Sequence, residues 1–103
     1  MIKVSVMYPN GEGHTFDMTY YMEKHVPLVR QELGEAIKGV AVDEGLASAA
    51  PGSRPAYLVL GHFLFDSVEA FQGSFAQHGQ ALLRDIPNFT NTVPTIQISE
   101  VKI

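Results

Sequence analysis

His25 and Tyr21 are the residues whose types and spacing most strongly suggest a catalytic role. They lie four positions apart in a segment of helical periodicity, so their side chains share one face of the predicted helix. Imidazole changes its charge near about pH 6.5, which suits general acid–base catalysis, and a neighbouring phenol can donate to a carbonyl oxygen or orient a substrate hydroxyl. A structural role is the alternative, because Pro27 leaves the Glu23 carbonyl free to accept a hydrogen bond from a core histidine.

The other three histidines are weaker candidates. His78 falls in the apolar stripe of a second predicted helix, where it could be an axial haem ligand, a second acid–base group or a boundary residue. His62 lies among leucines on a predicted strand and is expected to pack at an interface. His14 lies in a glycine-flanked loop, either solvated or covering the mouth of a pocket.

Several kinds of site are disfavoured by what the chain lacks. Without cysteine it has no disulfide, thiolate metal site or iron–sulfur cluster, and no HExxH or GxSxG motif occurs. The glycines at 11 and 13 give only GEG, which is a weak phosphate-binding pattern. We therefore expect no metal, no cofactor and no acyl-enzyme chemistry.

Aromatic residues are numerous for so small a core. Packing accounts for most of them, but a surplus of rings between helices and a sheet also suits an apolar pocket with few polar groups. The aromatic residues considered for that pocket are Tyr8, Tyr20, Tyr21, Phe63, Phe71, Phe75 and Phe89.

Composition limits the class of protein. The chain has 103 residues, of which 46% are hydrophobic and 17% charged, and its net charge is −4. No basic run is present, so nucleic-acid binding through phosphates is not expected. No apolar stretch approaches the roughly 20 residues that cross a bilayer, and the N-terminus does not resemble a signal peptide. We expect a cytoplasmic protein, and the shortage of charge suggests self-association.

The first half of the chain predicts a strand, a helix and a second strand. Residues 2–8 alternate as a strand does, and a loop follows at 9–13. Residues 18–33 have helical spacing, with Asp17 as the N-cap, a staple between Phe16 and Tyr21, and a kink at Pro27. Residues 38–46 resemble a weaker strand.

The second half of the chain also predicts a strand, a helix and a strand, although its sequence does not repeat that of the first half. After a loop at 47–55, residues 56–65 form a strand that is apolar on both faces. Asp66 and Glu69 then suggest a capping box for a helix that ends at Pro87. The last strand spans 95–103, with a change of parity that suggests a bulge near Ser99 and Glu100.

The order βαββαβ predicts an α+β, ferredoxin-like single domain over residues 1–103 with a four-stranded antiparallel sheet. Two helices cover one face of such a sheet. Because strand 56–65 is apolar on both faces, the second face must also be covered, and the chain has nothing left to cover it. We therefore expect a homodimer, joined through the open sheet face, that forms a dimeric α+β barrel.

Two segments resemble the EthD family, named for ethyl tert-butyl ether degradation. The first is Phe16-Asp17-x-x-Tyr20-Tyr21-x-x-Lys24-His25-x-Pro27-Leu28, and the second is Asp85-Ile86-Pro87-Asn88-Phe89-Thr90-Asn91 followed by Pro94 and Gln97. The resemblance covers essentially the whole chain. It implies the same barrel fold, an association with catabolic operons, and importance for Asp17, Tyr20, Tyr21, Lys24, His25 and Pro27.

Three functions follow as hypotheses. The first is a cofactor-free enzyme that moves a proton on a small hydrophobic metabolite, with His25 as base and Tyr21 or Tyr20 as hydrogen-bond donor. The second is an accessory protein that binds the metabolite or delivers it to an oxygenase, and the third is haem binding through His78. Residues expected to contact the substrate are Tyr8, Asp17, Phe63, Phe75, His78 and Phe89.

Overall fold

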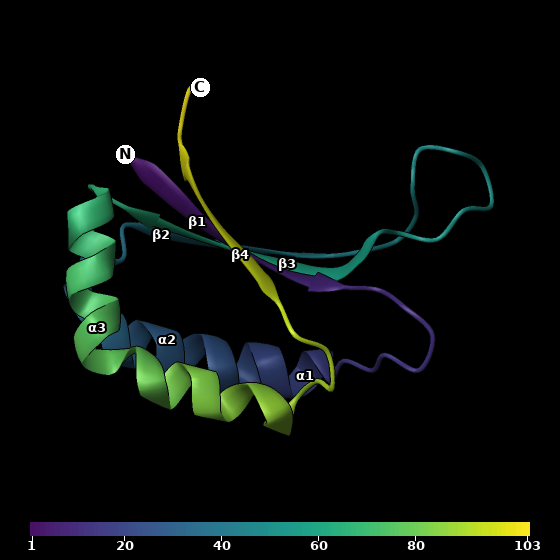
Figure 1. Ribbon diagram of the computed structural model, residues 1–103, viewed down its shortest axis with the longest axis horizontal. Coiled ribbons are helices and arrows are strands. Elements are labelled where there is room, and N and C mark those ends of the chain that lie inside the picture. The colour runs from purple at the N-terminus through teal and green to yellow at the C-terminus, as the bar shows by residue number, and fades with distance from the viewer.

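Four antiparallel strands form one sheet, in the order β2-β3-β1-β4, and the helices lie together on one of its faces (Figure 1). The computed structural model describes residues 1–103. The predicted βαββαβ order and antiparallel sheet are confirmed. The elements are β1 (Ile2–Pro9), α1 (Met18–Tyr20), a π-helical turn (Tyr21–His25), α2 (Val26–Leu33), a 3-10 turn (Gly34–Ala36), β2 (Gly39–Glu44), β3 (Tyr57–Phe65), α3 (Val68–Asp85), a 3-10 turn (Ile86–Asn88) and β4 (Thr95–Glu100).

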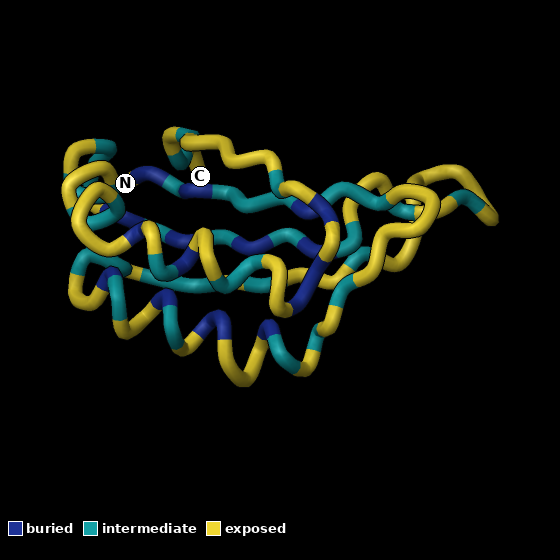
Figure 2. The backbone as a smooth tube through the Cα atoms, turned by 60° about the horizontal axis from the view of Figure 1, so that its bottom comes forward, coloured by how far each residue is buried: buried dark blue, intermediate teal, exposed yellow.

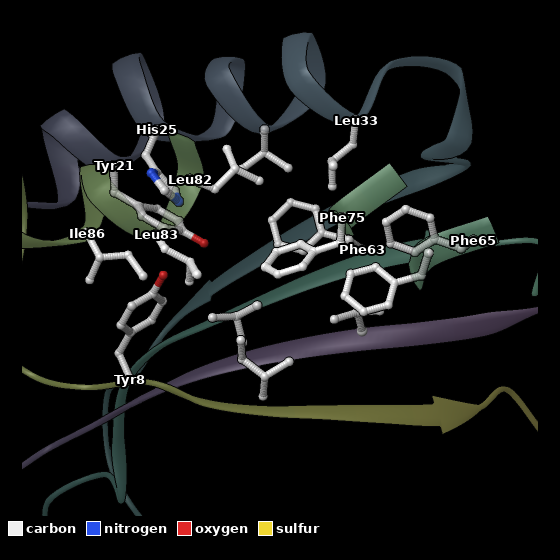
Figure 3. A pocket seen from close by; sticks show the side chains of 15 residues that line it. Tyr8, Tyr21, His25, Leu33, Phe63, Phe65, Phe75, Leu82, Leu83 and Ile86 are labelled. Atoms are coloured by element: carbon white, nitrogen blue, oxygen red, sulfur yellow. The ribbon is translucent and has the colours of Figure 1, made fainter. Parts of the chain in front are cut away.

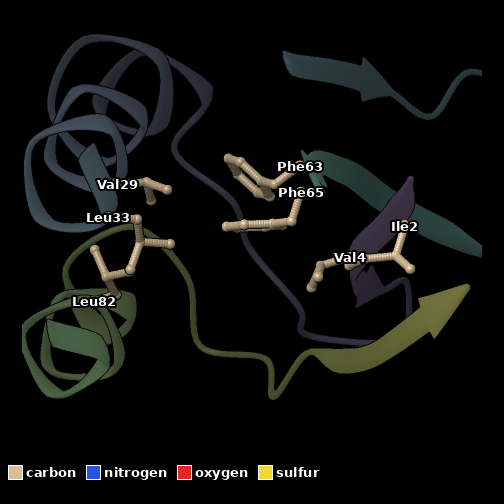
Figure 4. Close-up of a cluster of buried hydrophobic side chains, with 7 residues drawn as sticks. All are labelled: Ile2, Val4, Val29, Leu33, Phe63, Phe65 and Leu82. Carbon is tan, nitrogen blue, oxygen red and sulfur yellow. The ribbon is translucent and has the colours of Figure 1, made fainter. Parts of the chain in front are cut away.

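The two faces of the sheet are buried to different extents. On the helix-facing side of β3, every second residue from Val59 to Phe65 is buried, while Leu58, Leu60 and Leu64 on the other side are half-buried. The core has two clusters of buried side chains, and the larger one, of seven side chains, is drawn in Figure 4. Its members are Ile2, Val4, Val29, Leu33, Phe63, Phe65 and Leu82.

The start of the first helical segment agrees with the sequence pattern. The Asp17 carboxylate accepts a hydrogen bond from the Tyr20 backbone N–H at 3.0 Å, which makes Asp17 the N-cap. The rings of Phe16 and Tyr21 are 5.1 Å apart, so the predicted hydrophobic staple is also present.

Pro27 has a larger effect than the simple kink expected. Because proline has no N–H, it cannot donate to the Glu23 carbonyl, and the helix is irregular just before it. Residues Tyr21–His25 form a π-helical turn, in which the Val26 N–H donates to the Tyr21 carbonyl five residues earlier. Such turns are rare and occur frequently at functional sites.

Two expectations for the second half are wrong. The N-cap of α3 is Ser67, not Asp66, because Ser67 has the extended backbone and its hydroxyl accepts from the Ala70 N–H at 3.1 Å. No bulge is present near Ser99, since β4 pairs with β1 in unbroken register up to Glu100. The change of parity has a simpler cause: Val101 lies beyond the end of the strand.

The loop between β2 and β3 projects beyond the end of the sheet, and most of its residues are exposed (Figure 2). It therefore lies apart from the layer between the helices and the sheet. None of the helices is long and apolar enough to cross a membrane.

Candidate functional site

A narrow apolar pocket lies between the helices and the sheet (Figure 3). Fifteen side chains line it, fourteen of them hydrophobic, and the remaining one is His25. The cavity among them has a volume of about 60 Å³ and is partly open to solvent. These properties fit a small apolar ligand fixed by few polar groups.

His25 enters this pocket from the π-helical turn. It is 5% exposed, and its ring stacks on Tyr21 at 5.5 Å and contacts Phe89 at 4.6 Å. Its Nδ1 lies 2.9 Å from Oδ2 of Asp85, at the end of α3. The partner of His25 is thus a carboxylate, and not the Glu23 carbonyl considered in the structural alternative.

Asp85 is held by three side chains. Its Oδ1 accepts hydrogen bonds from the Tyr20 hydroxyl at 2.6 Å and from Nδ2 of Asn88 at 3.0 Å, and its Oδ2 accepts from His25. Burial raises the pKa of Asp85, but these hydrogen bonds outweigh burial and hold its pKa below the ordinary value. Asp85 is therefore an ionised carboxylate at neutral pH.

The π-helical turn explains how Tyr20 and His25 reach the same carboxylate. Residues five positions apart in an α-helix point roughly 140° away from each other around its axis, because each residue turns the helix by about 100°. The π-turn closes its hydrogen bonds over five residues instead of four, which brings the two positions closer around the axis. The π-helical turn thus brings Tyr20 and His25 to one carboxylate, that of Asp85 at the end of α3.

Asp85 also determines the protonation of the imidazole. An ionised carboxylate can only accept, so Nδ1 of His25 must donate its proton to Asp85. Burial lowers the pKa of His25, and the hydrogen bond and charge of Asp85 offset only part of this effect. The ring is consequently neutral near pH 7, and Nε2 carries the lone pair on the side of the pocket, without a hydrogen-bond partner in the chain.

Two phenols line the same pocket. Tyr8 and Tyr21 are each 1% exposed, and Figure 3 shows both hydroxyl oxygens directed into the space between helices and sheet. Tyr21 reaches this position above Gly61 of β3, where a Cβ atom would collide with its hydroxyl. Burial raises the pKa of Tyr21 to about 12 and that of Tyr8 further still, so both phenols are neutral donors.

The other predicted site residues fall in different places. Phe63 and Phe75 line the pocket, and Phe89 packs beside it against the Tyr8 and Tyr21 rings. Tyr20 contacts Asp85 from outside the pocket, and Asp17 is exposed and caps the helix.

The expectation that His78 lies on the apolar face is wrong. Its side chain is 45% exposed, and Nδ1 lies 3.5 Å from a carboxylate oxygen of Glu32 on α2. The buried position of that helical turn belongs to Gly79, one residue later, where a Cβ would meet the Phe75 ring. One residue rotates a helical side chain by about 100°, which is enough to place His78 on the surface.

The remaining histidines lie far from His25. On the open sheet face, Nδ1 of His62 is 2.9 Å from the Ser5 hydroxyl, and Nε2 is 3.4 Å from an Asp43 oxygen. His14 is exposed, with Nδ1 3.0 Å from the Pro9 carbonyl oxygen. No group of three His, Cys, Asp or Glu residues is arranged to hold a metal ion.

Asp85 and Asn88 are site residues that composition and helical spacing do not predict. Both belong to the second of the segments on which the family resemblance rests, which was the available signal. Helical periodicity could not identify them, because Asp85 is the last residue of α3 and lies 60 positions from its partner His25.

The chain matches the model of the EthD domain over residues 10–92. It belongs to the EthD family. The EthD segments singled out in the sequence include the residues of the Asp85–His25 pair and its partners Tyr20 and Asn88. The resemblance to this family is therefore confirmed.

Solved structures of EthD-family proteins share the fold. An EthD-like protein of Ralstonia eutropha JMP134 is 44% identical, with a TM-score of 0.95 over 99% of this chain and 92% of that one. An ethyl tert-butyl ether degradation (EthD) family protein of Bacillus halodurans C-125 is 20% identical, with a TM-score of 0.75 over 99% of each chain. HapK from Hahella chejuensis, at 11% identity and a TM-score of 0.65 over 99% and 93%, shares the fold alone. No curated protein is significantly similar.

Proposed function

We propose that this EthD-family protein is a cofactor-free enzyme that moves a proton on a small, largely apolar metabolite, with His25 as the general base. The observation that carries this proposal is the orientation of His25. Nδ1 is engaged by the Asp85 carboxylate at 2.9 Å, and the ring also lines the apolar pocket. A base fixed in one tautomer and kept neutral at working pH is what proton abstraction requires.

The surroundings of His25 support catalysis as well as binding. The pocket walls are almost entirely hydrophobic, which lowers the local dielectric constant and strengthens the few polar interactions inside. Because the family is named for the degradation of an ether, we place the metabolite in a catabolic pathway. Isomerisation, lactone rearrangement and dehydration are reactions that the imidazole and the neighbouring phenols can support.

The alternative is an accessory protein that binds a metabolite and delivers it to a separate oxygenase. The small apolar pocket would serve that purpose equally, but this function does not require the Asp85–His25 pair. The two proposals differ in what happens when His25 is replaced by an amide of similar size.

Deuterium exchange in cyclohexanone tests the proposal. The ketone is incubated in D2O with the protein, and exchange beside the carbonyl is followed by NMR. We expect wild-type protein to accelerate exchange and His25→Gln to lose about 10²-fold or more of that rate, the usual contribution of a general base. His14→Gln, in an exposed loop, is the matched control. Equal rates for wild type and His25→Gln would contradict catalysis by His25, and retained ligand binding would then favour the accessory role.

We also propose that a second copy of the chain covers the open sheet face. Leu58, Leu60 and Leu64 on that face are only half-buried within one chain. A two-fold arrangement would bring the same leucines of both copies together, as in an isologous interface. Such a dimer leaves the helix-facing pocket within each subunit.

A further inference from the structure

Tyr8 and Tyr21 have buried hydroxyls that the chain does not use. Each side chain is 1% exposed, yet neither hydroxyl makes a hydrogen bond within the protein, and neither oxygen is sealed from the pocket. Buried polar groups in proteins nearly always have a partner. The natural partner of both phenols is therefore a group on the molecule that fills the pocket.

Tyr8 and Tyr21 are neighbours in the pocket. The Tyr8 and Tyr21 rings are 5.8 Å apart in an edge-to-face arrangement, and ionisation of either one disfavours that of the other. Both hydroxyls point into the same space in Figure 3. Tyr21 is fixed from one side by its stacking on His25 and from the other by Gly61 beneath its hydroxyl. The pocket thus presents two neutral donors together with His25, whose ring lies 5.5 Å from that of Tyr21.

We propose that Tyr8 and Tyr21 together bind the oxygen of a carbonyl substrate and stabilise the enolate formed from it. The substrate class that follows is a small, mostly apolar ketone or lactone with a removable proton beside its carbonyl. This inference rests on the proposed role of His25 as general base. It adds the oxyanion-binding residues and the class of compound.

The proton and electrons of this step balance within the site. Nε2 of His25 takes the proton from the carbon beside the carbonyl, and the electron pair of the broken C–H bond forms the enolate oxygen anion. The Tyr8 and Tyr21 hydroxyls donate to that anion. Imidazolium then returns the proton to the same carbon, or to the far carbon of a conjugated system, which yields an isomer. No oxidant, reductant or leaving group is needed.

A saturated ether or hydrocarbon fits the polar groups less well. An ether oxygen can accept a hydrogen bond but develops no negative charge, and its C–H bonds are not acidic enough for an imidazole. A hydrocarbon would leave both phenols without a partner in a buried site. A carbonyl compound with an acidic C–H bond uses both donors and the base together.

Binding of 4-nitrophenol tests the oxyanion pair, because its phenolate mimics an enolate in size and charge. 4-Nitrotoluene has a similar shape and lacks the oxygen. We expect 4-nitrophenolate to bind at least tenfold more tightly than 4-nitrotoluene, and Tyr8→Phe and Tyr21→Phe each to reduce that preference severalfold. Tyr57→Phe, at an exposed tyrosine outside the pocket, should preserve it. Equal affinities for the two compounds in wild-type protein would overturn the proposal.

The ionisation of the bound ligand gives a second measurement that needs no tyrosine substitution. An apolar pocket alone would raise the pKa of bound 4-nitrophenol, whereas two donors aimed at its oxygen would lower it. Absorbance titration of the complex in the His25→Gln variant removes the base from this comparison. A lowered ligand pKa supports the oxyanion pair, and a raised one overturns it.

The two proposals can fail separately. Tight 4-nitrophenolate binding that depends on the tyrosines, without deuterium exchange in cyclohexanone, would retain the oxyanion pair and reject catalysis by His25. Exchange that depends on His25 but is unchanged in the Tyr8→Phe/Tyr21→Phe double variant would retain the base and reject the oxyanion pair.

Discussion

Asp85 and His25 are 60 positions apart in the chain, and their side chains meet through a hydrogen bond of 2.9 Å. The bond joins the end of α3 to the π-helical turn and fixes which imidazole nitrogen faces the pocket. Tyr20 and Asn88 hold the carboxylate from its other oxygen. Asp85 therefore orients the imidazole of His25, although it does not line the pocket itself.

Asp85→Asn tests this orienting role. The amide can accept from His25 but carries no charge, so the preferred tautomer and the ring position are no longer fixed. We expect the rate of deuterium exchange to fall by about 10²-fold, with ligand affinity changed far less, because Asp85 does not line the pocket. Asp66→Asn, at an exposed residue 3.9 Å from Lys38, is the control. An unchanged rate in Asp85→Asn would mean that the carboxylate has no part in catalysis.

The exchange rate should depend on pH through His25. Its pKa lies below the ordinary value because of burial, so the rate should rise with pH and level off with a midpoint below about 6.5. Asp85 raises the pKa of His25, so Asp85→Asn should move the midpoint to lower pH still. A pH–rate profile of both proteins checks these directions. A midpoint above that of free histidine would contradict the assignment.

Alkaline stability should depend on Tyr8 and Tyr21. Their pKa values are raised in the folded protein, so above about pH 10 the unfolded chain loses protons that the folded chain retains. The free energy of unfolding should fall there by up to about 1.4 kcal/mol per pH unit for each tyrosine. Urea titrations across this range should give a shallower decline for Tyr8→Phe, and the wild-type slope for Tyr57→Phe. Parallel curves for all three proteins would refute the explanation.

The assembly state can be tested on the open sheet face. Leu60→Glu places a charge at the centre of that face, and it should convert a dimer to a monomer without unfolding the chain. Leu46→Glu, at an 88% exposed position in the long loop, should leave the dimer intact. Light scattering coupled to size-exclusion chromatography measures both masses. A monomeric wild-type protein would exclude the dimer.

The sequence predicted the parts of the structure that depend on local patterns. Alternation identified the strands, Asp17 and Phe16 were correctly placed at the helix start, and βαββαβ order followed from these elements. Local patterns gave a wrong prediction where two adjacent residues could both cap the same helix. Asp66 and Ser67 are both good N-caps, and only the backbone of the fold selects Ser67.

The site was predictable only in part. His25 and Tyr21 could be paired because their spacing is local, and they do stack on one another. The partnership with Asp85 depends on how α3 packs on the first helical segment, which no periodicity encodes. Similarly, Pro27 indicated a disturbance in the helix, but whether it would be a bend or a π-helical turn depends on the packing around it.

The π-helical turn makes the winding of this segment as important as the identities of its residues. Tyr20 and His25 meet at Asp85 because the turn accommodates one residue more than a regular helix would. The same residues wound as a regular α-helix would retain every side chain of the site, but Tyr20 and His25 would then lie about 140° apart around the helix axis. The tyrosine and the histidine would face different directions, so the winding of this one turn keeps both side chains on the Asp85 carboxylate.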